Sequence, residues 1–127
     1  MDLIAHIQQQ YGVSPEYLWE KYPQFCIFRR FDNQKWFAAL MKNMNAQKLG
    51  LATPETVDIL NLKCDPEFAK MILIDHKSIF PAYHMNKKHW ISVVLNRIAD
   101  DELKNLIAHS YQQTQSKKKS FRQPEKK

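Results

Sequence analysis

The stretch "FCIFRRFDNQKWFAALM", residues 25–41, decides the fold class, because it holds two apolar runs separated by a short polar segment. Both runs, FCIFRRF and KWFAALM, have the length of a strand and are rich in aromatic residues. Asp32 and Asn33 tolerate the left-handed backbone conformations of tight turns. The stretch therefore predicts a β-hairpin that turns at residues 32–34.

Three further segments predict strands. The run VDILNLKC, residues 57–64, alternates and is mostly apolar, as in a strand with a buried face. The runs PAYHM, residues 81–85, and HWISVVL, residues 89–95, flank a polar turn and predict a second hairpin. We expect its packed face to consist of Tyr83, Met85, Ile91 and Val93, with Lys87 and Lys88 projecting from the turn.

Four segments predict helices. Residues 2–10 show helical spacing and stop near Gly12, and residues 13–22 predict a second helix, with Ser14 as its cap, that ends before Pro23. A third helix is expected to start at Asp65-Pro66-Glu67, and residues 43–56 between the strands are expected to form a loop. The last helix opens at residues 100–102, and its buried stripe is Leu103, Leu106, Ile107, Ser110 and Tyr111. This order predicts an α+β fold, an antiparallel β-sheet of about five strands with helices packed on it.

Length and composition favour one domain over residues 1–116, followed by a basic tail, residues 117–127, that we expect to be disordered. No run approaches ~18 apolar residues, which argues against a membrane span. The start MDLIAHIQQQ lacks the cationic and apolar regions of an export signal, so the expected location is the cytoplasm.

The net charge of +6 is concentrated in the tail. Residues 117–127 carry six basic side chains and one acidic, whereas residues 1–116 hold thirteen basic and twelve acidic side chains. Two segments of the body are nevertheless basic, since residues 26–48 and residues 77–97 each carry a net charge of +4. If the two segments share a face, they form a basic patch.

The sequence gives little support for a metal site, a cofactor or a glycine-rich phosphate loop. The chain has only two glycines, Gly12 and Gly50, too few for a glycine-rich phosphate loop. Cys26 and Cys64 form no CxxC pair, and we expect two buried, reduced thiols. A three-residue turn at 86–88 would place the nearby histidines, His84 and His89, on opposite faces of the hairpin, whereas a two-residue turn would bring them to one face but would still need a distant third ligand. We therefore predict no metal site and no cofactor.

An enzyme is not expected either. His109 and Ser110 are neighbours in a predicted helix, so their side chains point about 100° apart and do not form a base and nucleophile pair. Ser110 lies on the apolar stripe, where a hydroxyl usually bonds a backbone carbonyl.

Nucleic-acid binding has a physical basis in the predicted hairpins. Basic side chains in or near their turns can neutralise phosphates, and an exposed indole can stack on a base. The candidate contacts to DNA are Arg29, Arg30, Lys35, Trp36, Lys87, Lys88 and His89, with the tail as a further source of cations. The alternative is that both Trp36 and Trp90 are core residues and that the lysines form a solvated rim.

Several strings together resemble the MmcQ/YjbR family from about Ser14 to Thr114. They are PEYLW, FRRFDNQKWFAALM, VDILNLKCDP, FPAYHMNKKHWISVVL and LIAHSY, in this order. The matching motif positions are Lys35, Trp36, Lys63, Tyr83, His84, Asn86, Lys87, His89, Trp90, Ser110 and Tyr111.

The resemblance implies a compact domain with an antiparallel sheet, similar to secretion-chaperone-like folds and to a double-wing DNA-binding domain. It implies DNA binding by analogy of fold, without a catalytic role or cofactor. The alternative that it leaves open is a protein- or peptide-interaction module in which the sheet or a groove binds a partner.

Overall fold

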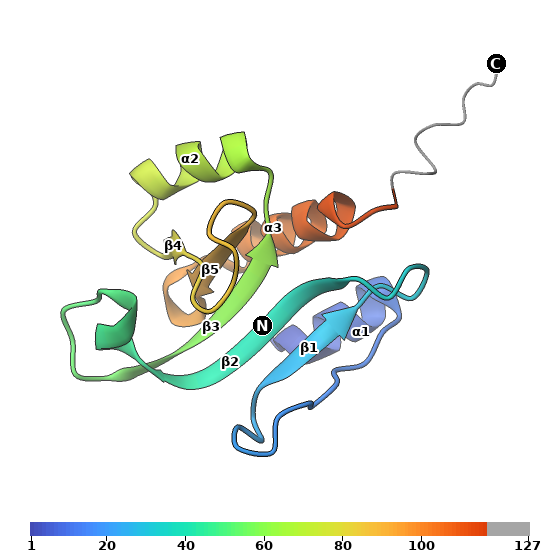
Figure 1. Ribbon diagram of the computed structural model, residues 1–127, viewed down its shortest axis with the longest axis horizontal. Helices are drawn as coiled ribbons and strands as arrows, with labels where there is room; N and C mark the ends of the chain where they lie inside the picture. The colour runs from blue at the N-terminus through green and yellow to red at the C-terminus, as the bar shows by residue number, and fades with distance from the viewer. Residues whose placement is uncertain (117–127) are drawn as a thin grey trace.

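The computed structural model describes residues 1–116, and its centre is an antiparallel sheet of five strands (Figure 1). In spatial order the strands are β1 (Cys26–Arg29), β2 (Trp36–Asn45), β3 (Thr56–Lys63), β5 (Trp90–Val94) and β4 (Ile79–Pro81). Together with the helices, this sheet confirms the predicted α+β class. The prediction for residues 117–127 lies outside the described part of the chain.

The helices that flank the sheet are α1 (Leu3–Tyr11), α2 (Pro66–Asp75) and α3 (Asp100–Gln113), with short 3-10 turns at Ala46–Leu49 and Leu95–Arg97. Helix α1 ends as predicted at Gly12, whose φ of 69° is left-handed. Helix α2 begins as predicted at Asp65, whose carboxylate accepts hydrogen bonds from the backbone N–H groups of Glu67 and Phe68. No helix among the described residues is both long enough and apolar enough to cross a membrane.

Helices α1 and α3 cover one face of the sheet, behind it in Figure 1, and enclose the main core. The strands contribute the side chains at alternate positions, and the helices contribute their predicted stripes. Core members include Leu40, Leu60, Leu62, Ile91 and Val93 from the strands and Ile7, Leu103, Leu106 and Ile107 from the helices. Full burial of one such side chain contributes ~1.5–3 kcal/mol, so this face supplies most of the stability.

A smaller apolar cluster lies on the opposite face of the sheet, at the far ends of β2 and β3. Met41, Met44, Val57, Ile59 and Val94 form it, covered by Phe25, Phe80 and Tyr83 among others. Strand side chains alternate between faces, so neighbours in sequence enter different clusters. The expectation that Tyr83 shares a packed face with Ile91 and Val93 was therefore wrong.

Residues 82–89 form a loop over this second face (Figure 1). The loop is held by two buried side chains that face each other on β3 and β5, Asn61 and Ser92. The Asn61 amide donates to the Tyr83 carbonyl at 2.9 Å, and the Tyr83 N–H donates to the Ser92 hydroxyl at 2.9 Å. The Ser92 hydroxyl in turn donates to Asn61 Oδ1 at 2.5 Å. The predicted second hairpin is therefore present with a shifted first strand, β4, which pairs with β5 and ends at Pro81, while residues 82–85 of the expected strand belong to the pinned loop.

Residues 13–22 are not helical, which contradicts the prediction from their cap and proline. The segment instead runs beside β1 and pairs with it, because the backbones of Glu16 and Ile27 exchange two hydrogen bonds of 2.9 Å. The Glu16 carboxylate also pairs with Arg29 at 3.0 Å. These contacts outweigh a weak local preference for helix and cover an open sheet edge. The predicted loop at 43–56 is likewise shorter, since β2 continues to Asn45.

Replacing Asn61 by alanine should lower the free energy of unfolding by ~1–3 kcal/mol, because it leaves buried polar groups without partners. Urea unfolding of the variant and wild type measures the loss. Asn96→Ala, at an exposed position, is the matched control and should leave stability almost unchanged. An Asn61→Ala midpoint equal to the wild-type midpoint would contradict the role of this hydrogen bond.

His109 makes stability depend on pH. Its Nε2 atom accepts a 3.3 Å hydrogen bond from the Asp65 N–H, and burial lowers the pKa of His109, which the nearby Asp65 carboxylate offsets only in part. The unfolded chain therefore takes up a proton more readily, and this histidine should destabilise the fold as pH falls below its ordinary pKa of 6.5. The free energy of unfolding of His109→Gln should fall less than that of wild type between about pH 7.5 and about pH 5. If urea titrations showed the same fall in the free energy of unfolding for both proteins, His109 would not be the group responsible.

Candidate functional site

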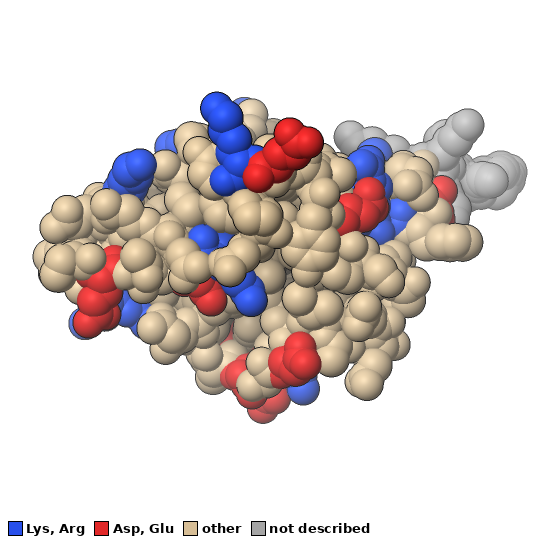
Figure 2. Space-filling view, turned by 90° about the horizontal axis from the view of Figure 1, so that it is seen from below, with Lys and Arg blue, Asp and Glu red and all other residues tan. Residues whose placement is uncertain are grey.

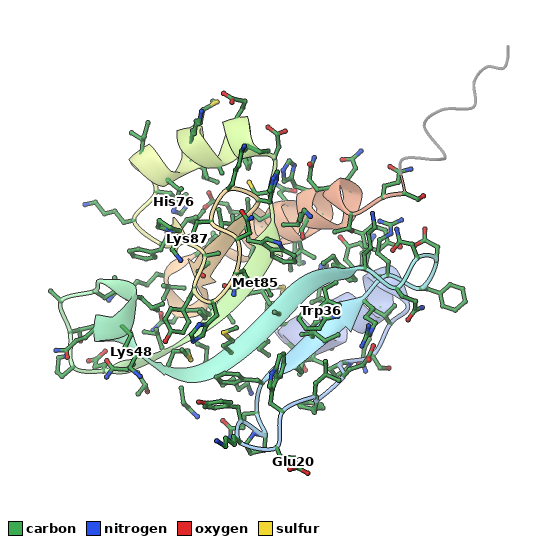
Figure 3. The ribbon with its side chains drawn as sticks, viewed as in Figure 1. Glu20, Trp36, Lys48, His76, Met85 and Lys87 are labelled. Atoms are coloured by element: carbon green, nitrogen blue, oxygen red, sulfur yellow. The ribbon has the colours of Figure 1, made fainter. Side chains whose placement is uncertain are left out.

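A shallow hollow of about 400 Å³ lies where β2 begins, β3 ends and β5 begins; we call it the tryptophan hollow. Its lining comprises Gln34, Lys35, Trp36, Lys63, Met85, Asn86, Trp90 and Thr114. Figure 3 shows Trp36 and Met85 on the same side of the sheet. The hollow therefore combines two indoles and two lysines, which come from the first hairpin, the end of β3 and the start of β5.

The sheet itself brings these residues together. Leu62 and Ile91 point into the main core, so their neighbours Lys63 and Trp90 point to the opposite face. Trp36 joins them because the register of β1 against β2 shifts between Phe28 and Arg29, which leaves both Phe37 and Ala38 in the core and pairs Trp36 with Arg29. Strands β3 and β5 are antiparallel neighbours with Lys63 directly paired to Trp90. Residues separated by more than fifty positions in sequence thus share one end of one face.

The hollow has a positive electrostatic character. Among residues 1–116, Lys35 and Lys63 are its charged lining residues, and no carboxylate contributes to the lining. The Lys63 ammonium lies 5.7 Å from the centroid of the Trp90 ring, a cation–π distance. Lys35 is exposed, and its backbone N–H donates to the Asn33 side chain at 3.0 Å. The arrangement can attract an anion and offer a π face beside it.

Both tryptophans of the hollow are half-buried, so the alternative that they are core residues does not hold. Trp36 packs edge-on against Trp19, with ring centroids 6.1 Å apart and an interplanar angle of 83°. The guanidinium carbon of Arg29 lies 6.0 Å from the Trp36 centroid. These contacts fix the Trp36 ring while part of its surface stays open.

Five of the seven predicted DNA-contacting residues lie in or beside the tryptophan hollow, and the two arginines are not among its lining residues. Lys35 and Trp36 line the hollow, and Lys87, Lys88 and His89 lie in the neighbouring loop. Within that loop the Lys87 ammonium donates to the Ala82 carbonyl at 3.0 Å, the Lys88 side chain is exposed, and the His89 carbonyl accepts the Cys64 N–H at 2.7 Å.

The two arginines do not project as free cations. Arg29 pairs with Glu16 at 3.0 Å. Arg30 is 6% exposed, pairs with Asp32 at 2.8 Å, donates to the backbone carbonyl of Tyr111, and lies 3.9 Å from the Tyr111 ring centroid. The hydrogen bond to Asp32 raises the pKa of Arg30 further. Arg30 therefore fastens the first hairpin to the end of α3.

The hollow also contains residues that residue-by-residue reasoning missed, chiefly Lys63 and Asn86. Both belong to the family motif, but their types and positions alone gave no reason to place them beside Trp36. The missing information was the pairing of β3 with β5, which is non-local in sequence.

The nearby thiol and hydroxyl have structural roles. Burial raises the pKa of Cys64 to about 11, so its thiol stays protonated and is a poor nucleophile or ligand. The Ser110 hydroxyl donates to the Phe37 carbonyl at 2.5 Å and accepts the Lys63 N–H at 2.8 Å, as its place on the apolar stripe predicted. Within residues 1–116, no three His, Cys, Asp or Glu side chains cluster as a metal site would require.

A structural role for Arg30 predicts that Arg30→Gln lowers the free energy of unfolding by ~1–3 kcal/mol, since a buried cation with three partners is lost. Urea unfolding tests this. Arg97→Gln removes an equal charge from an exposed side chain and should have little effect. If the two variants were equally stable, Arg30 would be free to act as a surface cation.

The fold and the hollow define a small α+β protein with an antiparallel sheet covered by helices on one face. The YjbR family model matches residues 8–113, and the chain belongs to this family. The resemblance in the sequence motifs is thereby confirmed.

Relatives and solved structures agree with this assignment. The protein YyaQ of Bacillus subtilis is 45% identical over 89% of this chain and 95% of its own length. The protein YjbR of Escherichia coli is 28% identical over 71% of this chain and 80% of its own. A crystal structure of a protein from Pseudomonas syringae superposes with a TM-score of 0.84 at 40% identity, covering 89% of this chain and 96% of the other.

Proposed function

We propose that this protein is a small non-enzymatic DNA-associated protein, and that the tryptophan hollow holds one unpaired base. The observation that carries the proposal is the joint presence of two partly exposed indoles and two lysines in a hollow to which no carboxylate of residues 1–116 contributes. A base stacked on an aromatic side chain contributes ~1–3 kcal/mol, and this stacking is largely independent of sequence. Lysines beside the ring would neutralise the adjoining phosphates.

The size of the hollow favours a single strand over a duplex. A volume of about 400 Å³ lies at the lower end of small-ligand sites and suits one base with its sugar. A base becomes available to an indole only when it is unpaired or flipped out of the helix. Lys87 and Lys88 border the hollow and could track the backbone to either side.

The described part of the chain has little net charge with which to attract a polyanion. Residues 1–116 carry a net charge of only +1, and Figure 2 shows lysine and arginine interspersed with acidic side chains on the face that it presents. The six basic residues of 117–127 supply additional charge by their sequence alone. We expect the tail to raise affinity for any polyanion and the hollow to supply the preference for unpaired bases.

A protein-interaction module is the second candidate function, and an exposed apolar pair on α2 favours it. Met71 and Ile74 are 66% and 81% exposed, and their three-residue spacing places them on one side of the helix. Binding to such a surface depends little on salt, whereas binding to phosphates weakens steeply with it.

The proposal predicts salt-dependent binding of a fluorescently labelled oligothymidylate, measured by anisotropy with the full-length protein. Replacing both Lys35 and Lys63 by glutamine should flatten the slope of log K against log salt by about 1.4 units, since each phosphate contact to a single strand contributes about 0.7. Lys77→Gln with Lys104→Gln removes the same charge from two other exposed positions and is the matched control.

Equal slopes for the two double variants would show that the hollow does not contact phosphate. Trp90→Leu should weaken binding at every salt concentration while leaving the slope unchanged, because stacking does not release counterions. A duplex that binds as tightly as the single strand would contradict the role of an unpaired base.

A further inference from the structure

A second pocket, of about 450 Å³, lies at the opposite end of the same face, over the smaller apolar cluster; we call it the lysine-rimmed pocket. It forms between the segment before β1, the far end of β2 and the loop after β4. It shares no lining residue with the tryptophan hollow. Its volume lies within the range of small-molecule sites.

Aromatic rings from two distant segments form the walls of this pocket. Tyr22 and Phe25 are stacked, with centroids 4.7 Å apart and an interplanar angle of 11°. Tyr83 and His84 contribute a second pair, with centroids 4.0 Å apart. Met44 also lines the pocket and belongs to the cluster that Phe25 and Tyr83 cover. Such walls suit a flat aromatic group.

Three lysines surround the aromatic walls. Lys21, Lys42 and Lys48 line the pocket, and no aspartate or glutamate of the part of the chain that the structure describes belongs to its lining. All three are exposed, and none of them forms an ion pair with a carboxylate within the described residues. Figure 3 places Lys48 at the end of the molecule away from Trp36. An anion in the pocket would relieve the repulsion among these charges.

The backbone of the pocket is held in uncommon conformations on two sides. Among residues 1–116 three non-glycine residues have positive φ, and two of them, Asn43 at 59° and His84 at 62°, line this pocket. Asn43 lies where the register of β2 against β3 shifts. Its N–H donates to Asp58 Oδ1 at 2.9 Å, and its amide donates to Gln24 Oε1 at 2.7 Å. Such strain, maintained by specific bonds, is common at binding sites.

We propose that the lysine-rimmed pocket binds a small planar aromatic anion. The rings would stack on its flat part, and one or two ammonium groups would pair with its acidic group. This site is independent of the proposed DNA contact, because the charge, the aromatic walls and the strained backbone belong to other residues. A single ion pair at ~4 Å in water changes affinity about fivefold, so charge and stacking should be separable.

The test uses the full-length protein with ¹³C-labelled methionine methyl groups, because Met44 lines this pocket and Met85 lines the tryptophan hollow. The probe is naphthalene-1-sulfonate, a flat aromatic anion, and its uncharged counterpart is 1-naphthylamine. We expect the sulfonate to bind at least about fivefold more tightly than the uncharged amine. The Met44 resonance should shift during the titration, and the Met85 resonance should stay in place.

Lys42→Gln with Lys48→Gln should weaken binding of the sulfonate about fivefold if one of the two ammonium groups pairs with it and about 25-fold if both do, and it should leave binding of the uncharged amine unchanged. Lys77→Gln with Lys104→Gln is the charge-matched control and should alter neither. Equal affinity for the two probes, a shift of Met85 instead of Met44, or no binding would each overturn the proposal.

This experiment can contradict either of the two proposed sites without contradicting the other. A titration of the same labelled protein with oligothymidylate should shift Met85 and not Met44. Loss of that response counts against the DNA contact alone, and loss of the sulfonate response counts against the lysine-rimmed pocket alone. An oligonucleotide that shifts Met44 would show that the pocket takes part in binding nucleic acid and does not select small anions.

Discussion

The buried contact between Asn61 and Ser92 is the constraint on which the second face of the sheet depends. The two side chains are directly opposed on β3 and β5 and are both fully buried. An amide and a hydroxyl in such a place are costly unless each is hydrogen-bonded. Their partner is the backbone of Tyr83, so satisfying them requires residues 82–89 to fold back over the sheet. The position of this loop then defines one wall of the tryptophan hollow and one wall of the lysine-rimmed pocket.

The main core and this polar contact contribute differently to the fold. The apolar face under α1 and α3 supplies stability without specifying what happens on the other side. Ser110 and Arg30 hold α3 in place, since Ser110 bonds the backbones of β2 and β3 while Arg30 holds the first hairpin to the end of α3. Buried polar groups of this kind favour one arrangement over others more than they add to the net free energy.

Local sequence patterns were sufficient for the elements whose structure is determined by their own residues. The hairpin at 25–41, the capped start of α2 and the stripe of α3 all follow from spacing and capping residues. The patterns failed where a distant partner decides the conformation. Residues 13–22 carry a good helix start, yet their backbone pairs with β1, and residues 82–85 resemble a strand, yet Asn61 and Ser92 pin them in a loop.

Only the part of the candidate site that lies in a locally determined element was predictable. Lys35 and Trp36 lie in a hairpin that the sequence defines, so their neighbourhood was foreseeable. Lys63 and Asn86 join them through the pairing of β3 with β5 and the pinning of the loop, neither of which leaves a local pattern. Arg30 shows the converse, because a basic residue beside a turn became a buried connection to Tyr111.

Trp19 lies between the two sites, and its fluorescence should respond to ligands in either one. Its indole lies 6.1 Å from that of Trp36 in the tryptophan hollow and 6.3 Å from the ring of Phe25, which lines the lysine-rimmed pocket. Indole emission depends on the polarity and the quenching groups around the ring, so a ligand that shifts Trp36 or Phe25 should also change the emission of Trp19. Intrinsic fluorescence of this protein should therefore show that a ligand is bound, but it should not show which of the two sites holds the ligand.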